Sequence, residues 1–473
     1  MSEKNSSVIN KFEQATLDES STKPLYFSKV TIEGDNGSSP LSNGFYKTIL
    51  EHPLTAPLQN VDSSLSMFQA IRNNFLYTGL YQDVSVSFEQ DYDSATLEYM
   101  RNGIPHEYGI ELPIPTHAKI SLKPSALYNS NAASTTINDD SASLAVCRTW
   151  LNQLGLADSE MLYWGINYNP IKSAWEGITC KGFVSVPLMR NPSIKGLLDF
   201  EYNELTDLSS DSQTTKKDYE NVTSMGFKKS WILDNCKSIP FFYTGLSFTN
   251  RLSRNKNDKS GEAREYYLKT GVISQFQHDT RKFFGTLPIS GYLLKLNNEY
   301  VLSQSNLHSL DESIENNFNK FQFNLEHHVS YLKNIFTRSF DLQFGGIVPM
   351  AEIESVHPAD RFCSTGTNLL RGFQPSSSDF ANNFYYKVGL NTSHKIYRTP
   401  LNSPLRLGLF LNIGNAFNDL QNAFDSYAAA AGASLFYKTP QADMDLTYAY
   451  PLTSRPQDIA KPGFSFGIKF SYF

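Results

Sequence analysis

The residue types that commonly do chemistry occur in this chain, but not in the spacings that catalysis or metal binding requires. His327 and His328 follow Glu326, yet neighbouring residues of a strand point to opposite faces, so the two imidazoles cannot hold one metal ion together. There is no Gly-x-Ser-x-Gly, His-Glu-x-x-His or phosphate-binding motif, and no Cys-x-x-Cys pair that would indicate a zinc site. The four scattered cysteines are Cys147, Cys180, Cys236 and Cys363. We therefore expect no enzymatic activity, no catalytic residue, no metal and no cofactor.

One arginine has a setting that favours a binding role. Arg371 belongs to the sequence Leu370-Arg371-Gly372-Phe373, inside a stretch of more than thirty residues, Pro349 to Asn382, that shows no convincing strand pattern. The same stretch contains Asp360-Arg361-Phe362. Loops of this length within an ordered domain are usually functional or disordered. By itself Arg-Gly-Phe is typical of a solvated loop arginine, so its interpretation depends on the elements that position it.

Those elements are predicted by alternation, which is clearest in the last ten residues. One face of this segment would carry five large apolar side chains, and the other face would carry small or polar ones. The apolar residues are Phe464, Phe466, Ile468, Phe470 and Tyr472, the opposite face has Ser465, Gly467, Lys469 and Ser471, and the segment ends at Phe473. A soluble edge strand with such an exposed face invites aggregation, whereas a closed membrane barrel requires this pattern.

Similar alternating segments recur from about residue 124 to the C-terminus, so the chain is expected to be mainly β. We count about sixteen of them at a mean spacing near 22 residues, which suits tilted strands of about ten residues joined by turns and loops. A soluble β-sandwich or a solenoid also has alternating strands. The aromatic face on so many consecutive strands, without a fixed repeat motif, favours a transmembrane antiparallel β-barrel at 124–473 with its long loop at about 349–382.

The composition is compatible with a barrel and excludes other classes of protein. The 473 residues are 19% charged and 13% aromatic, with a mean hydropathy of -0.36. No stretch approaches the roughly 18 consecutive apolar residues of a membrane-spanning helix, while the polar lumenal half of a barrel lowers the hydropathy. The formal net charge of -6, without a basic cluster among aromatic residues, argues against nucleic acid as a partner.

The first quarter of the chain has a different pattern. Residues 1–23 are polar and partly acidic, which predicts a disordered tail and fits neither a secretory signal nor an Arg-rich transit peptide. Residues 24–123 show the order strand, helix, helix, strand, strand, and the second helix has an apolar face at Phe68, Ile71 and Phe75. This order predicts a small α+β domain.

The loop sequence Leu370 to Phe373, its position between the eleventh and twelfth expected strands and the aromatic end of the chain resemble the barrel-assembly superfamily. That superfamily includes the bacterial outer-membrane insertase, the chloroplast translocation pore and the mitochondrial sorting and assembly machinery. The resemblance implies that the loop folds back into the lumen and that Arg371 forms a hydrogen bond with the inner wall. It covers residues 24–473, most strongly from residue 270 onward.

Two further motifs support the resemblance. A segment before the ninth expected strand looks like the family's Asp-x-Arg and Pro-x-x-Gly signature, with Asp279, Arg281, Pro288 and Gly291. The thirteenth expected strand carries a second motif, which the resemblance places opposite the loop, with Phe410, Asn412 and Gly414.

The partner of the loop arginine departs from the family pattern. Bacterial relatives commonly have an aspartate there, whereas this chain has Asn412, which alternation independently turns into the lumen. A charge-assisted bond would become a weaker charge-to-dipole bond. Either Asn412 or another acceptor would then hold Arg371.

The α+β domain is similar to a POTRA domain, and the chain has only one. One such domain, about sixteen strands and no signal peptide resemble the mitochondrial members of the family. This resemblance implies a location in the mitochondrial outer membrane with the N-terminal domain in the intermembrane space. The implied partners are membrane lipids, unfolded β-barrel precursors and accessory subunits of the sorting and assembly machinery.

The seam between the first and last strands is the expected gate. The first strand, about Ser125 to Ile137, is small and polar, and the last strand contains Gly467 and follows Pro462. Such strands specify their register weakly, and an open edge can pair with an incoming strand. We expect an insertase that pairs the C-terminal strand of each precursor here, with the segment Phe464 to Phe473 as both its own sorting signal and one side of the gate. A porin-type channel or a protein-conducting translocase is the alternative.

Overall fold

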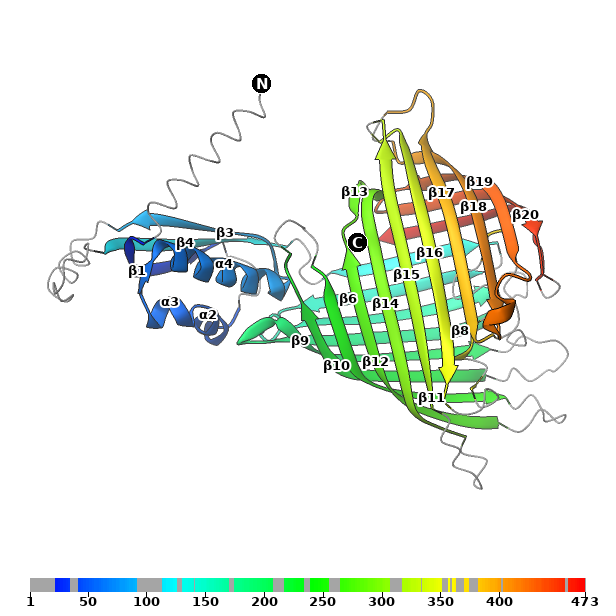
Figure 1. Cartoon of the computed structure of the whole chain (residues 1–473), viewed down its shortest axis with the longest axis horizontal. Coiled ribbons are helices and arrows are strands. Elements are labelled where there is room, and N and C mark those ends of the chain that lie inside the picture. The colour runs from blue at the N-terminus through cyan, green and yellow to red at the C-terminus, as the bar shows by residue number, and fades with distance from the viewer. Residues whose placement is uncertain are drawn as a thin grey trace. The chain divides into compact units, whose positions relative to one another are not determined.

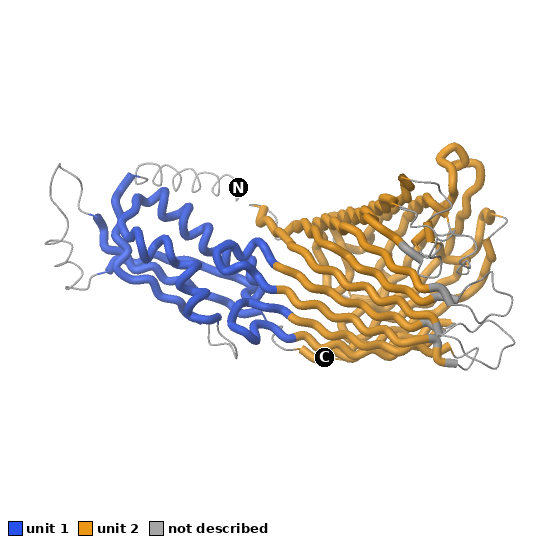
Figure 2. Tube along the Cα trace, turned by 90° about the horizontal axis from the view of Figure 1, so that it is seen from below, with its two compact units in different colours: residues 1–129, 150–159, 186–195 blue, residues 130–149, 160–185, 196–473 orange. Residues whose placement is uncertain are grey.

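The structure is a computed structural model, and it forms two compact units. They comprise residues 1–129, 150–159 and 186–195, and residues 130–149, 160–185 and 196–473 (Figure 2). The residues that can be described are 22–34, 41–91, 113–125, 130–139, 141–169, 174–206, 217–233, 239–254, 264–306, 317–332, 334–350, 356–357, 360–362, 370–373, 382–400, 403–455 and 458–472. Nearly all of the expected tail at 1–23, and also Phe473, lie outside the described residues.

The first unit contains a four-stranded sheet in the order β2-β1-β4-β3, accompanied by three helices (Figure 1). β1 runs parallel to β4, and the other neighbouring strands are antiparallel. The elements are β1 (Pro24–Glu33), α2 (Asn43–Ile49), α3 (Glu51–Thr55), β2 (Leu58–Asn60), α4 (Val61–Thr78), β3 (Tyr81–Gln90) and β4 (Ile114–Pro124). The expected small α+β arrangement is confirmed, and it resembles a POTRA domain.

Helix α4 forms where capping residues and apolar spacing agree. The Asn60 side chain accepts a hydrogen bond of 2.7 Å from the amide three residues later, and Gly79 ends the helix in the left-handed region at a φ of 81°. The face predicted from spacing is buried in the core of the unit, with Phe68, Ile71 and Phe75 at most 3% exposed. No helix among the described residues is long and apolar enough to cross a membrane.

The second unit is a closed barrel of sixteen long antiparallel strands, which confirms the expected architecture (Figure 1). Its strands are β5 (Asn131–Asn138), β6 (Ala142–Leu151), β7 (Ser159–Asn169), β8 (Ala174–Leu188), β9 (Asn191–Thr206), β10 (Lys217–Ser230), β11 (Phe241–Arg254), β12 (Arg264–Asp279), β14 (Leu287–Asn306), β15 (Phe318–Tyr331), β16 (Phe336–Pro349), β17 (Phe384–Lys395), β18 (Leu405–Phe417), β19 (Ala428–Lys438), β20 (Ala442–Thr453) and β21 (Gly463–Tyr472). The short β13 (Lys282–Phe284) pairs with the start of β14. The long loop therefore joins the eleventh and twelfth barrel strands, β16 and β17, as expected.

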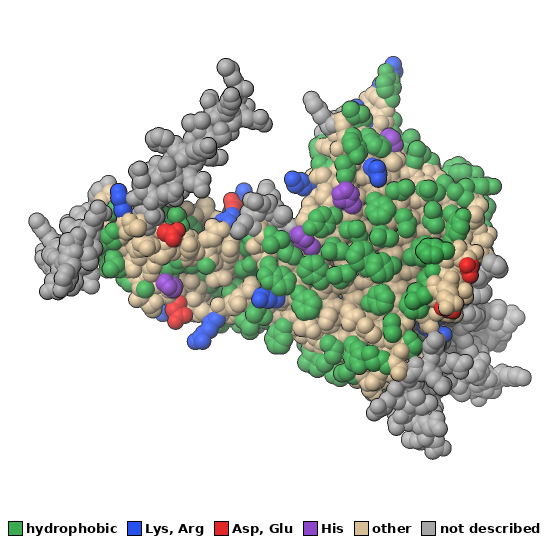
Figure 3. Space-filling view, viewed as in Figure 1, with side chains coloured by type: hydrophobic (Ala, Val, Ile, Leu, Met, Phe, Trp, Pro, Cys, Tyr) green, Lys and Arg blue, Asp and Glu red, His purple; other side chains and the backbone are tan. Residues whose placement is uncertain are grey.

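The barrel strands present one apolar face outward and a mixed face inward. On β18, Leu407 and Leu409 are 43% and 51% exposed, whereas Phe410 and Asn412 are 5% and 4% exposed. Figure 3 shows apolar side chains over much of the visible barrel surface. This alternation gives the barrel the outer surface that lipid requires.

The first barrel strand begins later than the sequence predicts. Ser125 still belongs to the α+β unit, because its amide donates a hydrogen bond of 2.8 Å to the Leu80 carbonyl. β5 then starts at Asn131, and it ends in a turn where the Asn138 amide donates to the Ser141 carbonyl. Alternation did not reveal this start, because Asn129 and Ser130, directly before it, are as polar as the strand itself.

Candidate functional site

The sequence Leu370 to Phe373 lies against the inner wall of the barrel. Leu370 and Phe373 are 1% and 6% exposed, and they pack with Ala428 and Ala430 of β19 in one apolar cluster. The amide of Lys461 donates to the Gly372 carbonyl at 2.8 Å, which ties this end of the loop to the chain just before β21.

Gly372 is required at its position for two reasons. Its φ of 87° lies in the left-handed region that favours glycine. A Cβ atom here would also lie 3.3 Å from the Cβ of Ala449 and 3.5 Å from that of Ala430. The positive φ and the tight contact with Ala449 therefore favour glycine in this turn, which brings Arg371 within reach of the wall.

The guanidinium of Arg371 rests on an aromatic ring and reaches one hydroxyl. Its central carbon lies 4.7 Å from the centre of the Phe410 ring, a cation–π arrangement. Its Nη1 donates to the Ser434 Oγ at 3.5 Å, and that hydroxyl lies 2.7 Å from the Thr447 hydroxyl. The arginine side chain itself remains exposed to the lumen.

The thirteenth-strand motif meets the loop, but the acceptor is Ser434 rather than Asn412. Asn412 lies opposite Ala430 in register, two residues along β18 from the ring on which Arg371 rests. Its side chain instead approaches β17, since its Oδ1 would be 3.1 Å from a Cβ on Gly389. Gly414 leaves space for the loop, because a Cβ there would lie 3.3 Å from the Cδ1 of Leu370.

The signature before the ninth barrel strand builds a corner at the rim. Arg281 donates from Nε and Nη2 to the Asp279 carboxylate at 3.0 and 2.8 Å, and from Nη1 to Glu326 of β15 at 2.9 Å. Gly291 has a φ of 96°, and a Cβ on it would lie 2.3 Å from the Thr280 carbonyl oxygen. The four signature residues thus lie together, but they form no described bond with Arg371.

The seam between β21 and β5 is short. Among the described residues its register runs from Gly467 opposite Asn138 to Tyr472 opposite Ala133, which is six pairs, close to the seven between β5 and β6 and well below the fourteen between β11 and β12. The start of β21 runs past the end of β5. There the Phe466 amide donates to the Asp139 carboxylate at 2.9 Å instead of to a strand.

A lumenal cavity of about 630 Å³ connects the seam with the loop arginine. Its lining combines polar groups of the seam strands with Arg371 and with charged residues of neighbouring strands. Among these residues are Thr136, Asn138, Lys469, Arg371, Ser434, Asp445, Pro288 and Glu326. The cavity therefore joins three motifs that the sequence suggested separately.

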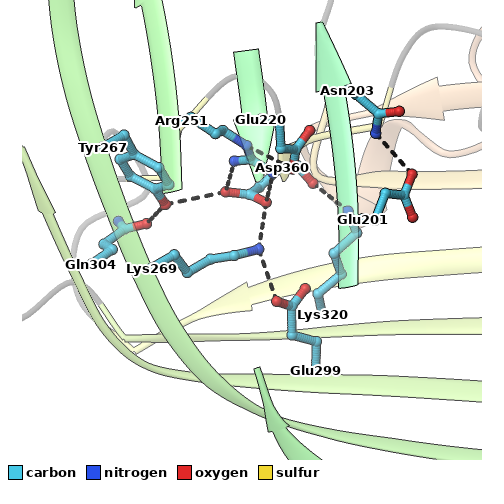
Figure 4. Close-up of polar contacts among 10 residues, drawn as sticks. All are labelled: Glu201, Asn203, Glu220, Arg251, Tyr267, Lys269, Glu299, Gln304, Lys320 and Asp360. Carbon is cyan, nitrogen blue, oxygen red and sulfur yellow. Dashed lines mark hydrogen bonds and ion pairs between the residues drawn. The ribbon is translucent and has the colours of Figure 1, made fainter. Parts of the chain in front are cut away.

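The sequence reasoning missed a buried ionic cluster around Asp360 (Figure 4). Asp360 is 1% exposed and receives hydrogen bonds from Arg251 of β11 and from Tyr267 and Lys269 of β12. The available signal was the presence of cations at buried positions of strands that otherwise alternate regularly. The sequence did not show which acidic group these cations would bind, because Asp360 is 109 residues from Arg251.

The barrel is closed by sixteen strands, a loop lies against its inner wall, and a POTRA-like unit precedes it in the chain. These features define the class as a membrane β-barrel with an N-terminal POTRA-like unit. Residues 74–471 match the model of the Omp85 superfamily domain. The chain belongs to the Omp85 superfamily, and the family suggested by the sequence motifs is confirmed.

Individual relatives are distant in sequence. The chain is 23% identical over 264 residues to the sorting assembly machinery 50 kDa subunit of Saccharomyces cerevisiae, a match that covers 51% of this chain. It spans about half, 50%, of the length of that relative.

Solved structures share the fold at low identity. BamA from Haemophilus ducreyi lacking POTRA domains 1–3 gives a TM-score of 0.63 at 12% identity, covering 95% of this chain and 85% of that one. CdiB from Acinetobacter baumannii gives 0.62 at 12% identity, covering 96% and 74%.

Proposed function

We propose that this chain inserts β-barrel precursor proteins into the mitochondrial outer membrane and accepts each precursor at the seam between β5 and β21. The start of β21 carries the proposal, because it runs past the end of β5 and the Phe466 amide there donates to the Asp139 side chain instead of to a strand. The name of the yeast relative, a sorting assembly machinery subunit, supports the mitochondrial setting.

Opening the seam would break fewer backbone hydrogen bonds than opening a long strand pair such as β11 and β12. Each such bond contributes about 1 kcal/mol net, and the seam has six register pairs against fourteen between β11 and β12. The small side chains of Ser134, Thr135 and Thr136 add little cross-strand packing to hold the register. The seam is therefore the joint at which an incoming strand competes most easily.

The faces of β21 determine how an incoming strand would lie. Phe464 and Phe466 are 71% and 45% exposed on the outer face, whereas Lys469 lines the lumenal cavity. A precursor strand that pairs by β-augmentation and has the same alternation would place its apolar side chains in lipid and its polar side chains in the cavity. This is the pattern of a barrel's own C-terminal strand.

The surroundings follow from the same proposal. The α+β unit would lie in the intermembrane space, where precursors arrive, and membrane lipids would cover the apolar outer face. Accessory subunits of the sorting and assembly machinery would complete the assembly. The yeast relative and the POTRA-like unit are the support for this arrangement.

A disulfide across the seam tests the gate. Ser134 and Ser471 are register partners at the seam, so cysteines at both positions, in a chain whose four native cysteines are replaced, should form a bond on oxidation. We expect oxidation to stop insertion of a barrel precursor into vesicles and reduction to restore it.

A matched pair gives the control. Ser224 and Ser247 are register partners on β10 and β11, away from the seam, and their disulfide should leave insertion unchanged. Normal insertion with the Ser134–Ser471 bond closed would refute lateral entry at this seam.

A further inference from the structure

The carboxylate of Asp360 is held from several directions at once (Figure 4). Arg251 donates from Nη1 and Nη2 at 2.9 and 3.1 Å, a bidentate arrangement, and Lys269 Nζ donates at 2.7 Å. The Tyr267 hydroxyl donates at 3.1 Å. Lys320 of β15 donates to the backbone carbonyl of Asp360 at 2.8 Å. A loop residue is thereby fastened to three strands of the wall.

The charges of this cluster balance only when the loop is present. Arg251 also pairs with Glu220 at 2.9 Å, and Lys269 with Glu299 at 2.8 Å. With Lys320, the wall supplies three cations and two carboxylates, and Asp360 supplies the third carboxylate. Burial by itself would raise the pKa of Asp360, but the charges of Lys269 and Arg251 hold it well below its ordinary value.

The residues after Asp360 strengthen the same attachment. Phe362 is 2% exposed, lies 4.5 Å from the Tyr385 ring between centroids, and has the Lys320 ammonium 5.0 Å above its ring. The backbones of Phe362 and Asn382 exchange two hydrogen bonds of 2.8 and 2.6 Å. Charge, packing and backbone pairing all hold this end of the loop.

The Arg371 end is held by packing and backbone bonds but without an ion pair among the described residues: Leu370 and Phe373 pack against β19, and the Lys461 amide donates to the Gly372 carbonyl at 2.8 Å. Its guanidinium has one hydrogen bond of 3.5 Å and a cation–π contact, and it faces the cavity of about 630 Å³. Phe373 adds one turn bond of 3.3 Å to Leu370 and an isolated antiparallel bridge to Ala460. No carboxylate within the described residues forms an ion pair with Arg371, whereas Asp360 has two ion pairs.

We propose that Asp360 is the permanent anchor of the lumenal loop and that the Arg371 end is its releasable end, which leaves the wall when the polar side of a precursor strand fills the cavity. This inference rests on the proposed function in one respect only: that the group filling the cavity is a precursor strand. Asp360 is a positioning residue: it keeps Arg371 within reach of Phe410, so that the released end returns after each precursor leaves.

Backbone amide exchange at single residues tests the two ends without any insertion assay. The reporters are the amides of Phe362 and Asn382 at the Asp360 end, and those of Phe373 and Lys461 at the Arg371 end. Arg371→Ala should speed exchange of Phe373 and Lys461 while Phe362 and Asn382 stay within about twofold of the wild type. Asp360→Asn should speed exchange at both ends, by about a hundredfold or more at its own, because it removes the carboxylate that Arg251 and Lys269 share and leaves the buried cluster with one negative charge too few.

Two variants separate anchoring from general damage to the cluster. Glu299→Gln removes a carboxylate that pairs with Lys269 but does not touch the loop, and it should leave both reporter pairs near their wild-type rates. Arg251→Lys keeps the charge but loses the bidentate arrangement, and it should give intermediate exchange even if Asp360→Asn fails to fold.

Two outcomes would overturn the proposal. One is that Arg371→Ala speeds amide exchange equally at both ends, and the other is that Asp360→Asn speeds it only at Phe362 and Asn382. The result is independent of the seam disulfide. Insertion through a locked seam would refute the proposed function without changing the expected exchange rates. An unexpected exchange pattern would refute the anchor proposal without bearing on the seam.

Discussion

The functional side chain with the clearest geometry is the guanidinium of Arg371, and its binding depends on shape as well as charge. A planar guanidinium stacks on a ring such as Phe410 while donating to Ser434, whereas a lysine ammonium does one or the other. Asn412 is neutral, so Arg371 gains no ion pair at that position of β18.

Substituting Arg371 should loosen the loop by a measurable amount. Loss of the cation–π contact and the hydrogen bond, together about 1–2 kcal/mol, should lower the attached fraction about five- to thirtyfold for Arg371→Ala. Arg371→Lys should retain only part of the attached fraction. Precursor insertion into vesicles measures the effect on function.

Arg398→Ala is the matched control. That arginine also stacks on an aromatic ring, 5.5 Å from the centre of Tyr397, but in an exposed turn at the rim. Insertion should be unaffected by it. Equal losses from the two substitutions would mean that Arg371 acts only through general stability.

At the scale of elements, the turn at Gly372 determines how closely the loop approaches β19 and β20. Gly372→Ala adds strain at a φ of 87° and brings the new Cβ within 3.3 Å of the Ala449 Cβ, a tight contact. Gly285→Ala adds strain at a φ of 62° with nothing within 4 Å of the new Cβ. We expect faster amide exchange at Phe373 in Gly372→Ala but not in Gly285→Ala. Equal exchange rates at Phe373 in the two variants would contradict the crowding argument.

The corner signature is the element that local sequence predicts best. Asp279 and Arg281 are two residues apart, and the turn at Gly291 needs a positive φ. Both requirements are set by neighbours in the chain, so the motif indicated them. Glu326, which completes the ion pairs of Arg281, comes from β15 and required the fold.

At the scale of the whole molecule, the loop attaches to the lumenal wall through β11, β12 and β15 at Asp360 and against β18 and β19 at Leu370 to Phe373. A chain that acts as an open porin would have no use for such a loop. Replacing residues 351–381 by a short turn should therefore raise the single-channel conductance of the reconstituted barrel. Shortening the connection 307–316 by the same method should not.

An unchanged conductance after loop replacement would mean that the loop does not narrow the lumen and would favour the porin reading. The replaced chain should still form a β-rich, heat-resistant barrel in detergent, because its strand pairings do not include the loop. Circular dichroism and electrophoretic mobility before and after heating measure this.

The sequence by itself determined the features that depend on near neighbours. Period-two alternation indicated a barrel of sixteen strands, and it placed the loop between the eleventh and twelfth because each strand's faces are set residue by residue. Helical spacing likewise identified Phe68, Ile71 and Phe75 as a buried face. The motif around Arg371 did not by itself predict a loop inside the lumen, which only the family resemblance implied.

Only the tertiary structure decided which groups meet across the lumen. The choice of Ser434 over Asn412, the six-pair seam and the cluster around Asp360 all depend on the registers of strands far apart in the chain. A shift of two residues in one strand preserves its alternation but changes every such partner. Barrel closure sets those registers collectively, and for that reason no single segment of the sequence contains them.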